Sequence, residues 1–419
     1  MLSQEANDRL TKVGPGTPMG TLLRRYWYPV AMVRELEEFP VKKTRLLGEN
    51  FAVYKTPSGQ YGIADERCPH RGASMVYGIP EEGGIRCGYH GWKFDLRGKC
   101  TEQPAEPPDS NYKDKICLKS GRAQAMGGLV WAYIGPEPAP ELPRYEGYVM
   151  DGVRDIGHTM LPCNWLQIME NSVDPYHVEW LHNRYFQWLG NRENFEVGSA
   201  FKRVEHIKVG FDAFEHGIIK RRQLKGQTEE DDDWKIGHPL VFPYCMWVGG
   251  NGTYQMQIRV PVDDEQTWVA FYSCHAPDGI EAPTDRPVVD YEIPWIDDKG
   301  RYITDYIEGQ DIMAWVTQGG TANRTGEHLA TSDAGVIALR KMFRDSMTAV
   351  ESGSDPVAVV REPHDKIELP LERLKFGHGW EFSLQWLERG SQRYSPQQAE
   401  LIALHREAAR VRGDLKDAV

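Results

Sequence analysis

Cys-Pro-His-Arg-Gly-Ala at residues 68–73 and Cys-Gly-Tyr-His-Gly-Trp at residues 87–92 are the stretches that decide the fold of the first part of this chain. Each stretch supplies one Cys and one His, and sixteen residues separate the first His from the second Cys. Two thiolates and two imidazoles can hold tetrahedral zinc, or an iron–sulfur cluster in which two His replace two Cys on one iron. Zinc sites usually pair Cys with Cys and His with His along the sequence, so this alternating order favours the iron–sulfur cluster.

Cys68, His70, Cys87 and His90 resemble the ligands of Rieske [2Fe–2S] proteins. Rieske proteins of respiratory chains carry an extra Cys in each loop, which forms a disulfide, and neither loop has one here. The chain therefore resembles the Rieske non-haem iron oxygenases. A structural zinc ion, or Cys and His that are merely buried, is the alternative reading of the four residues.

The sequence around the two loops is typical of short strands separated by Gly and Pro. Strands are expected at residues 44–54, 60–64 and 129–134. A boundary is indicated by Pro136, Pro138, Pro140 and Pro143. We therefore expect a small all-β domain at residues 28–140 that carries the cluster, with residues 1–27 and 141–419 forming a larger domain.

The larger domain is expected to be α+β, with an antiparallel sheet and flanking helices. Strands are predicted at residues 240–248, 253–261 and 267–275. Helices are predicted at residues 164–182, 298–316, 332–350 and 396–411. The resemblance implies that this domain has the helix-grip (START-like) fold. The acidic run at residues 229–233 is expected to be a solvated loop.

Asp174, His177 and His182 lie within the first predicted helix of the larger domain. Two His and one carboxylate suit a mononuclear ferrous site that leaves positions open for oxygen. Residues 177 and 182 are about 140° apart on an ideal helix, so both can bind one metal only if the helix is distorted. The spacing therefore predicts a bulge or break between them. Core packing is the alternative role of the two His.

These three residues resemble the ferrous-iron motif of the Rieske oxygenases. The resemblance implies that His177 and His182 bind iron. It also implies that Asp174 forms a hydrogen-bonded bridge to His90 of the adjacent chain, where it would fix the imidazole tautomers. A helix cap or a surface charge is the alternative role of Asp174.

The third iron ligand must be a carboxylate farther along the chain. In the predicted helix 298–316, Asp311 lies at the edge of a mainly apolar stripe, whereas Asp305 lies on the opposite face. The stripe comprises Ile303, Ile307, Gln310 and Ala314. The pair Gln310-Asp311 also resembles the Gln-Asp pair that supplies this ligand in the phthalate dioxygenase branch. We expect Asp311 to be the ligand, with Glu308 and Asp305 as alternatives.

The resemblance implies the terminal oxygenase of the phthalate, phenoxybenzoate and chlorobenzoate dioxygenase branch, with a [2Fe–2S] cluster and mononuclear Fe(II). Such an enzyme dihydroxylates an aromatic substrate, expected to be an aromatic carboxylate, with O2 and electrons from NAD(P)H. The chain lacks a Gly-rich dinucleotide motif, so a separate flavin/iron–sulfur reductase is expected as electron donor. The resemblance also implies a homo-oligomer, either a trimer or stacked trimers.

Two other functions stay open. A Rieske monooxygenase or O-demethylase acting on a methoxy- or phenoxy-aromatic compound would use the same motifs. A small-molecule binding or electron-carrier protein belongs to another class, although a carrier would need only the cluster domain.

An aromatic acid would need a buried cation in the larger domain. The basic strand Gly217–Arg222 has alternate faces, so either Arg221 or the pair Lys220 and Arg222 points inward. A solvated strand face is the commoner explanation for these cations. Phthalate-specific relatives are expected to carry Arg where this chain has Ile219, which argues against ortho-phthalate. Further pocket candidates are His216, His238 and Tyr244.

Basic residues surround the cluster loops, although the chain as a whole is acidic. The ring comprises Arg67, Arg71, Arg86, Lys93, Arg97 and Lys99. It is either a solvated face or a docking patch for an acidic electron donor.

Composition excludes several classes of protein. The net charge of −12 over 419 residues argues against a nucleic-acid binder. No apolar stretch approaches the roughly 20 residues that span a bilayer, and the polar N-terminus does not resemble a signal peptide. Seven cysteines, an odd number, are expected of a reducing cytoplasm rather than of a disulfide framework.

Overall fold

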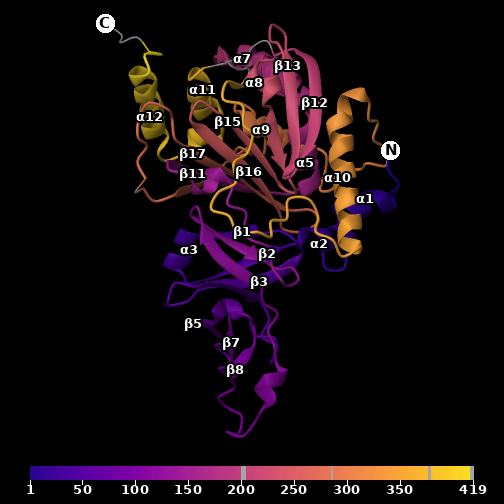
Figure 1. The fold of residues 1–419 in the computed structure, drawn as a ribbon, viewed down its shortest axis with the longest axis vertical. Helices are drawn as coiled ribbons and strands as arrows, with labels where there is room; N and C mark the ends of the chain where they lie inside the picture. Colours follow the sequence, from indigo (N-terminus) through magenta and orange to yellow (C-terminus); the bar gives the residue numbers. More distant parts are fainter. Residues whose placement is uncertain (200–203, 285, 376–378, 416–419) are drawn as a thin grey trace.

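The fold was analysed in a computed structural model of the chain, which describes residues 1–199, 204–284, 286–375 and 379–415. Figure 1 shows a narrow part made of the β5–β8 sheet at one end and a broad part built on a large sheet at the other. The described residues contain no helix long and apolar enough to cross a membrane.

Three small antiparallel sheets form the part of the chain that carries the two Cys-His loops. The first sheet contains β1 (Tyr28–Met32), β10 (Leu129–Tyr133) and β9 (Arg122–Met126). The second contains β2 (Val41–Leu46), β3 (Glu49–Lys55) and β4 (Tyr61–Asp65). The third contains β5 (Ile79–Glu81), β6 (Gly84–Arg86), β7 (Lys93–Asp95) and β8 (Cys100–Glu102). Only short helical pieces interrupt these strands: α3 (Val33–Glu38), η1 (Met75–Tyr77) and η2 (Tyr112–Lys115).

An eight-stranded sheet forms the centre of the broad part, in the order β12-β13-β14-β15-β16-β17-β11-β18 within the described residues. All neighbours are antiparallel except β11 and β18. The strands are β11 (Val153–Leu161), β12 (His206–Phe214), β13 (Gly217–Leu224), β14 (His238–Val241), β15 (Cys245–Gly250), β16 (Thr253–Pro261), β17 (Thr267–His275) and β18 (Val289–Glu292). The prediction of one strand at residues 240–248 is wrong, because the structure has two strands there, β14 and β15. The chain turns between them at Pro243, which cannot donate a hydrogen bond to a ladder.

Helices from both ends of the chain cover this sheet (Figure 1). The segments before the sheet are α1 (Gln4–Thr11), α2 (Pro18–Leu23) and α4 (Glu146–Val149). The segments inserted between its strands are α5 (Trp165–Val173), α6 (Tyr176–Glu179), η3 (Trp180–Tyr185), α7 (Phe186–Glu193) and α8 (Asp232–Lys235). The segments after it are α9 (Ile307–Val316), η5 (Thr331–Asp333), α10 (Ala334–Glu351), α11 (Glu381–Arg389), η7 (Ser391–Tyr394) and α12 (Gln398–Val411). The mixed helix and sheet fold class is thus confirmed.

Two predicted helices differ from the observed ones. The helix predicted at 164–182 ends at Asp174, because Pro175 follows and disfavours helical geometry at the residue before it. The helix predicted at 298–316 begins only at Ile307. Residues 297–301 instead form a turn, in which the Asp297 carboxylate accepts hydrogen bonds from two backbone amides and Gly300 has a φ of 75°.

Candidate metal centres and the adjoining cavity

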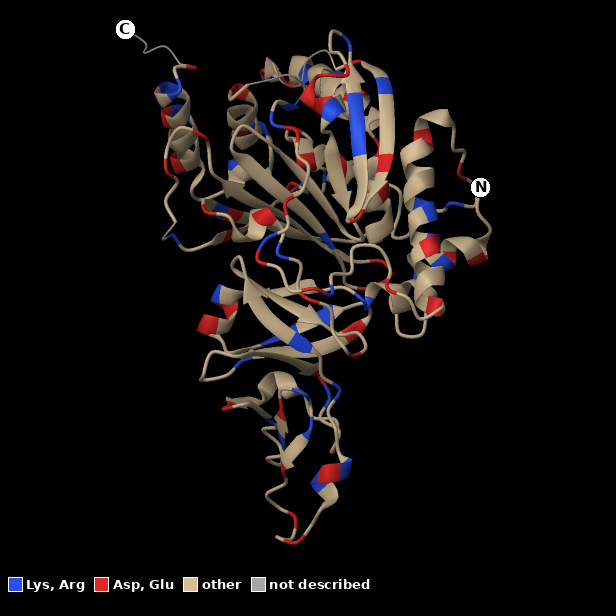
Figure 2. Ribbon diagram, viewed as in Figure 1, with Lys and Arg blue, Asp and Glu red and all other residues tan. Residues whose placement is uncertain are grey.

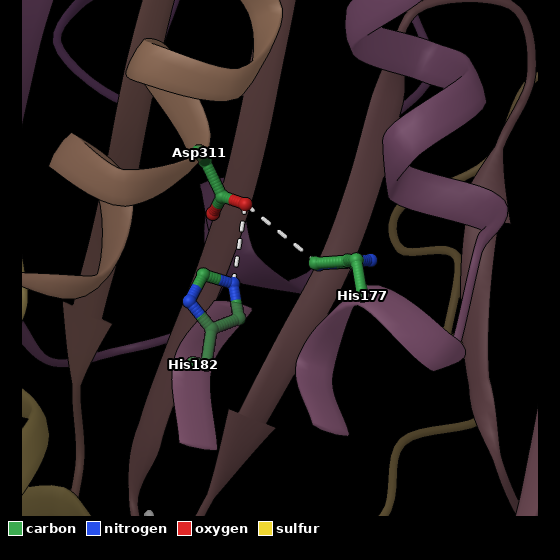
Figure 3. Close-up of side chains that lie close together, drawn as sticks. All are labelled: His177, His182 and Asp311. Atoms are coloured by element: carbon green, nitrogen blue, oxygen red, sulfur yellow. Dashed lines mark ion pairs between the residues drawn. The ribbon is translucent and has the colours of Figure 1, made fainter. Parts of the chain in front are cut away.

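His177, His182 and Asp311 converge at one point beside the large sheet (Figure 3). One ligand atom from each lies within 4.8 Å of the other two. Asp311 Oδ1 is 3.1 Å from His182 Nε2 and 3.7 Å from His177 Nε2. Asp311 comes from α9, whereas both His come from the segment that follows α5. The structure therefore brings together the two His and the carboxylate that a mononuclear iron site needs.

A π-helix places the two His on the same side. Trp180–Tyr185 adopts this wider helix, in which backbone hydrogen bonds join residues five apart. His177 lies in α6 just before the π-helix and His182 lies within it, so the wider turn between them reduces the angle that an ideal α-helix would put between the two side chains. The distortion predicted from their spacing is confirmed.

The three side chains fit a bound metal. Asp311 Oδ1, which faces both imidazoles, is buried and has no hydrogen-bond partner among the described residues. Burial lowers the pKa of His177 to about 3, so its imidazole is neutral near pH 7, the form that binds metal. Burial alone would raise the pKa of Asp311, but the imidazoles of His182 and His177 beside it keep that pKa below the ordinary value.

Gln310 orients the His182 ring. Its amide nitrogen donates to the carbonyl oxygen of Thr304, which leaves its oxygen facing His182 Nδ1 at 2.9 Å. An amide oxygen can only accept, so Nδ1 donates to it, which leaves Nε2 facing Asp311 as the atom that a metal would bind. Gln310 thus orients one of the metal-binding imidazoles, and its neighbour Asp311 supplies the carboxylate.

The alternative third ligands have other partners. The carboxylate of Glu308 accepts hydrogen bonds from the backbone amide and the hydroxyl of Ser391. Asp305 lies before α9 and pairs with Arg393 at 2.8 Å. Of the three acids considered for this role, Asp311 is the one that faces the two His.

Asp174 lies at the break between α5 and α6. Its Oδ1 accepts a hydrogen bond from the Tyr176 amide, and its Oδ2 is 3.8 Å from His177 Nδ1. The side chain is 30% exposed. Asp174 therefore caps the next helical turn and also stands between His177 and the surface.

Cys68, His70, Cys87 and His90 come together on the loops beside the β5–β8 sheet. The two thiols are buried, and the two imidazole rings lie 4.5 Å apart between centroids. The ring of His70 stacks on Trp92, and its Nδ1 is buried without a hydrogen-bond partner among the described residues. Burial, with the Cys87 thiol beside it, raises the pKa of Cys68 to about 11. Two thiols and two imidazoles with unused ligand atoms fit a [2Fe–2S] cluster, whose iron would favour the thiolate forms.

Comparison with known proteins agrees with both centres. Residues 26–120 match the Rieske [2Fe-2S] domain, and residues 141–349 match the catalytic domain of the ring hydroxylating alpha subunit. The chain is 41% identical over 376 residues to the 5,5'-dehydrodivanillate O-demethylase oxygenase subunit of Sphingobium sp. (strain NBRC 103272 / SYK-6), covering 88% of this chain and 86% of that protein. This chain belongs to the Rieske ring-hydroxylating oxygenase alpha subunits. The cofactors of such an oxygenase are a Rieske cluster and a mononuclear non-haem iron.

Other relatives of the oxygenase lie in the branch that the motifs suggested. It is 33% identical over 396 residues to the phthalate 4,5-dioxygenase oxygenase subunit of Pseudomonas putida, covering 85% of this chain and 89% of that protein. Among solved structures, the NdmA QL mutant of Pseudomonas putida CBB5 with caffeine has a TM-score of 0.57 at 20% identity, covering 82% of this chain and 98% of that chain. That likeness shows a shared fold.

The basic ring around the cluster of the oxygenase is partly neutralised. Figure 2 shows blue and red segments mixed in this part of the molecule. Arg86 pairs with Glu81 and Glu102, Lys93 pairs with Glu81, and Arg97 pairs with Glu137. Within the described residues, Arg67, Arg71 and Lys99 have no such ion pair. Any docking patch for a donor is therefore smaller than the ring of six.

A cavity adjoins the His177, His182 and Asp311 site, with an empty volume of about 560 Å³ including the part open to solvent. Strand β13 contributes Lys220 and Arg222, which are 3% and 1% exposed. Arg221 points away and pairs with Asp212. The expectation of a solvated face is thus wrong for Lys220 and Arg222 and holds only for the outward face of the strand. Alternation on a strand predicted the two possible arrangements but could not choose between them.

His238 also lines this cavity, but two other pocket candidates do not. Tyr244 lines a separate cavity, and His216 packs against Tyr145 and Phe214. Lys375, which was not among the residues expected from the sequence, also lines the cavity, from the segment before α11. No local motif marks it, because its position depends on a contact with a strand far away in the sequence.

The acidic run at 229–233 is only partly solvated, which corrects the loop prediction. Asp233 lies in α8, is 1% exposed and pairs with Arg222 at 3.2 Å. Arg222 also pairs with Glu372 at 3.2 Å, and that carboxylate lies 2.9 Å from His238 Nδ1. A buried cation on the strand thus recruits one member of the run as a counter-ion.

Proposed function

We propose that this chain is a terminal oxygenase component that uses O2 and electrons from NAD(P)H, delivered by a separate flavin/iron–sulfur reductase, to oxidise an aromatic substrate. The observation that carries the proposal is the convergence of His177, His182 and Asp311 beside a cavity, in a chain with a second cluster of four unused Cys and His ligands. Bound at the first site, ferrous iron would bind and activate O2, because two His and one carboxylate leave coordination positions open. Cys68, His70, Cys87 and His90 would hold the cluster that passes single electrons to it.

Two reactions fit this site. Dihydroxylation adds both atoms of O2, two electrons and two protons to an aromatic ring and yields a cis-diol. O-demethylation consumes the same reagents but converts an aryl methyl ether to a phenol, formaldehyde and water. An O-demethylase subunit at 41% identity supports the second reaction, and dioxygenase subunits at 42%, 33% and 32% identity support the first, so the relatives are consistent with either.

Product analysis tests the proposal and separates the two reactions. The iron-loaded oxygenase is incubated with NADH, a flavin/iron–sulfur reductase, and benzoates with and without methoxy groups. We expect substrate-dependent O2 uptake, with either a product 34 mass units heavier or formaldehyde at one equivalent per O2 consumed. Reduction of the cluster without any oxygenated product across the panel would argue instead for an electron carrier.

The proposal includes an oligomer in which each iron site receives electrons from the cluster of a neighbouring chain. Figure 1 places the β5–β8 sheet at the opposite end of the molecule from α9, so the two centres of one chain are well separated. A homo-oligomer, either a trimer or stacked trimers, would bring the cluster of one chain to the iron of the next, with Asp174 contacting His90 of the partner subunit. The cluster domain would then comprise residues 28–140, and residues 1–27 and 141–419 would form the iron domain.

A further inference from the structure

Gln257 places an amide group in the wall of the cavity that adjoins the iron ligands. It lies on β16, an inner strand of the large sheet, is 6% exposed and shares the cavity with His177, His182 and Asp311. Most of this side chain is therefore packed inside the protein, and the remainder faces the space beside the proposed iron.

Arg259 fixes the orientation of this amide. The two residues are two positions apart on β16, so their side chains lie on the same face of the sheet. The Arg259 guanidinium donates to Gln257 Oε1 at 2.6 Å and to the backbone oxygen of the same residue at 2.7 Å. Burial lowers the pKa of Arg259 to about 10, so the group stays charged near pH 7 and can only donate. The amide oxygen of Gln257 must therefore face Arg259, with the NH2 group on the other side.

A second amide holds the NH2 group in place. Gln257 Nε2 donates to Gln255 Oε1 at 2.8 Å. Gln255 Nε2 in turn donates to Ser273 Oγ at 3.2 Å, and Gln392 Nε2 donates to the same oxygen at 2.6 Å. These four side chains are at most 6% exposed, and their hydrogen bonds continue in one direction from Arg259 to Ser273. A buried polar row of this kind restricts Gln257 to one orientation.

One N–H of Gln257 is left for the cavity. The amide nitrogen carries two hydrogens, and within the described residues it makes one hydrogen bond. Two cations on the same cavity wall are engaged with the protein: Lys220 Nζ donates to the carbonyl oxygen of Ser172, and Arg222 pairs with buried carboxylates. The second N–H of Gln257 is thus a fixed, uncharged donor that a ligand in the cavity can reach.

We propose that Gln257 donates this N–H to an ether or carbonyl oxygen of the aromatic substrate, so that the oxygenase selects oxygen-substituted rings over plain hydrocarbons, an inference that rests on the proposed oxygenase function. A buried donor without a partner costs free energy, and a ligand oxygen removes that cost whereas a hydrocarbon does not. The amide has no charge, so it pairs with an uncharged oxygen without the need for a counter-ion. The aromatic ring would lie against the apolar walls, which include Val178, Met246, Val248, Ile307 and Trp386.

Paired ligands test this role. Methoxybenzene is compared with ethylbenzene, and acetophenone with isopropylbenzene, so that each pair exchanges an oxygen for a carbon group of similar shape. Calorimetry gives the Kd of each ligand for the iron-loaded oxygenase without reductant. The preference is the Kd of the hydrocarbon divided by the Kd of its oxygen-bearing partner, and comparing this ratio between wild type and variant cancels the difference in hydrophobicity within a pair. We expect at least one ratio to fall about 3- to 10-fold in Gln257→Leu, as the loss of one uncharged hydrogen bond implies. The pair with the larger change identifies the ether or the carbonyl as the acceptor.

Further variants control for structure. Gln257→Glu keeps an oxygen for Arg259 but has no N–H to donate, so it should lose the same preference. Arg259→Met should weaken the preference by releasing the amide, whereas Arg259→Lys, which can still donate to Oε1, should retain most of it. Gln266→Leu changes an exposed glutamine in the turn between β16 and β17 and should behave like the wild type. Iron content and the absorption of the cluster check that each variant is folded and loaded.

Three results would overturn the inference: no measurable binding of either oxygen-bearing ligand to the wild type, ratios that stay unchanged in both Gln257→Leu and Gln257→Glu, or an equal change in Gln266→Leu. These results differ from failure of the proposed function. Oxygenated products with unchanged ratios would leave the oxygenase standing and remove the role of Gln257. Changed ratios without any O2-dependent product would do the reverse.

Discussion

His177 and His182 show how single side chains prepare the iron site. The π-turn brings the two rings to the same side, and Gln310 holds one of them with Nε2 toward Asp311. His177 has a different environment, because burial keeps it neutral and its Nδ1 lies 3.8 Å from the Asp174 carboxylate. One imidazole is thus oriented by an amide, and the other faces both the site and Asp174.

Removing one imidazole should empty the iron site and leave the cluster in place. We predict that His177→Ala loses the mononuclear iron, with affinity falling by more than about 100-fold, because even outer-shell partners of metal ligands commonly contribute 10- to 100-fold. The [2Fe–2S] cluster should stay intact, since its ligands lie on other loops. Iron per chain and the electron paramagnetic resonance signal of the reduced cluster measure the two centres separately.

His364→Ala provides the matched control, because His364 is half-buried, accepts a hydrogen bond from the Arg144 amide and does not line the cavity. It should retain both metals. Full iron content and full turnover in His177→Ala would show that the iron site has been placed wrongly.

At the scale of elements, a buried ionic network joins α5 to α10. Glu170 of α5 accepts hydrogen bonds from Arg324 and from Arg340, the latter at 2.6 Å. Arg340 of α10 also forms a two-bonded pair with Glu327. Because α5 leads directly into the segment that carries both His, this network holds in place the helix that precedes the iron site.

Breaking this network should destabilise the protein strongly. Arg340→Leu leaves Glu170 short of one partner and Glu327 without its guanidinium, so we predict a loss of about 3–5 kcal/mol in the free energy of unfolding. Lys341→Leu, on the next residue, removes an exposed pair with Asp345 and should change stability by less than about 1 kcal/mol. Urea unfolding monitored by tryptophan fluorescence measures both. Equal effects of the two substitutions would mean that the buried network contributes no more than a surface pair.

At the scale of the whole molecule, the separation of the two centres bears most on function. Figure 1 shows the β5–β8 sheet at the far end of the molecule from α9, which carries Asp311, with β1, β2 and β3 between them. If electrons passed from the cluster to the iron of the same chain, they would have to cross much of the molecule. A head-to-tail assembly, which closes into a ring when the rotation between chains permits it, would shorten that path.

Mixed oligomers test this arrangement. Cys68→Ser should lose the cluster and His177→Ala the iron, so each homo-oligomer should be inactive. Co-expressed with different tags and purified through both tags, the two variants should recover about a third of wild-type turnover as a trimer, because one of the three head-to-tail contacts in every mixed trimer joins an intact cluster to an intact iron site. Product formation per chain measures the recovery.

Cys68→Ser co-expressed with Cys87→Ser is the control, since neither chain then carries a cluster, and it should stay inactive. If doubly tagged oligomers of Cys68→Ser and His177→Ala also show no activity, electrons pass between the two centres of the same chain.

Local patterns in the sequence determined much of this protein. The alternating Cys-His order on two loops, the five-residue spacing of two His, and the period of two along β13 are short-range features. Each of them narrows the possible chemistry or geometry without knowledge of distant contacts. They sufficed to predict the cofactors, the mixed fold class and a distortion between His177 and His182. The choice of Asp311 also rested on a local pair, and the structure places it opposite those two His.

Only the tertiary structure decided the rest, because it depended on contacts between residues far apart in the chain. The inward face of β13 is the one with Lys220 and Arg222, since buried Asp233 and Glu372 lie there to pair with Arg222. Lys375 reaches the cavity from 155 positions after Lys220, and the buried ion pairs of this region form only when all these side chains are assembled. Charge balance in a buried site is a property of its three-dimensional neighbours, which no window of sequence contains.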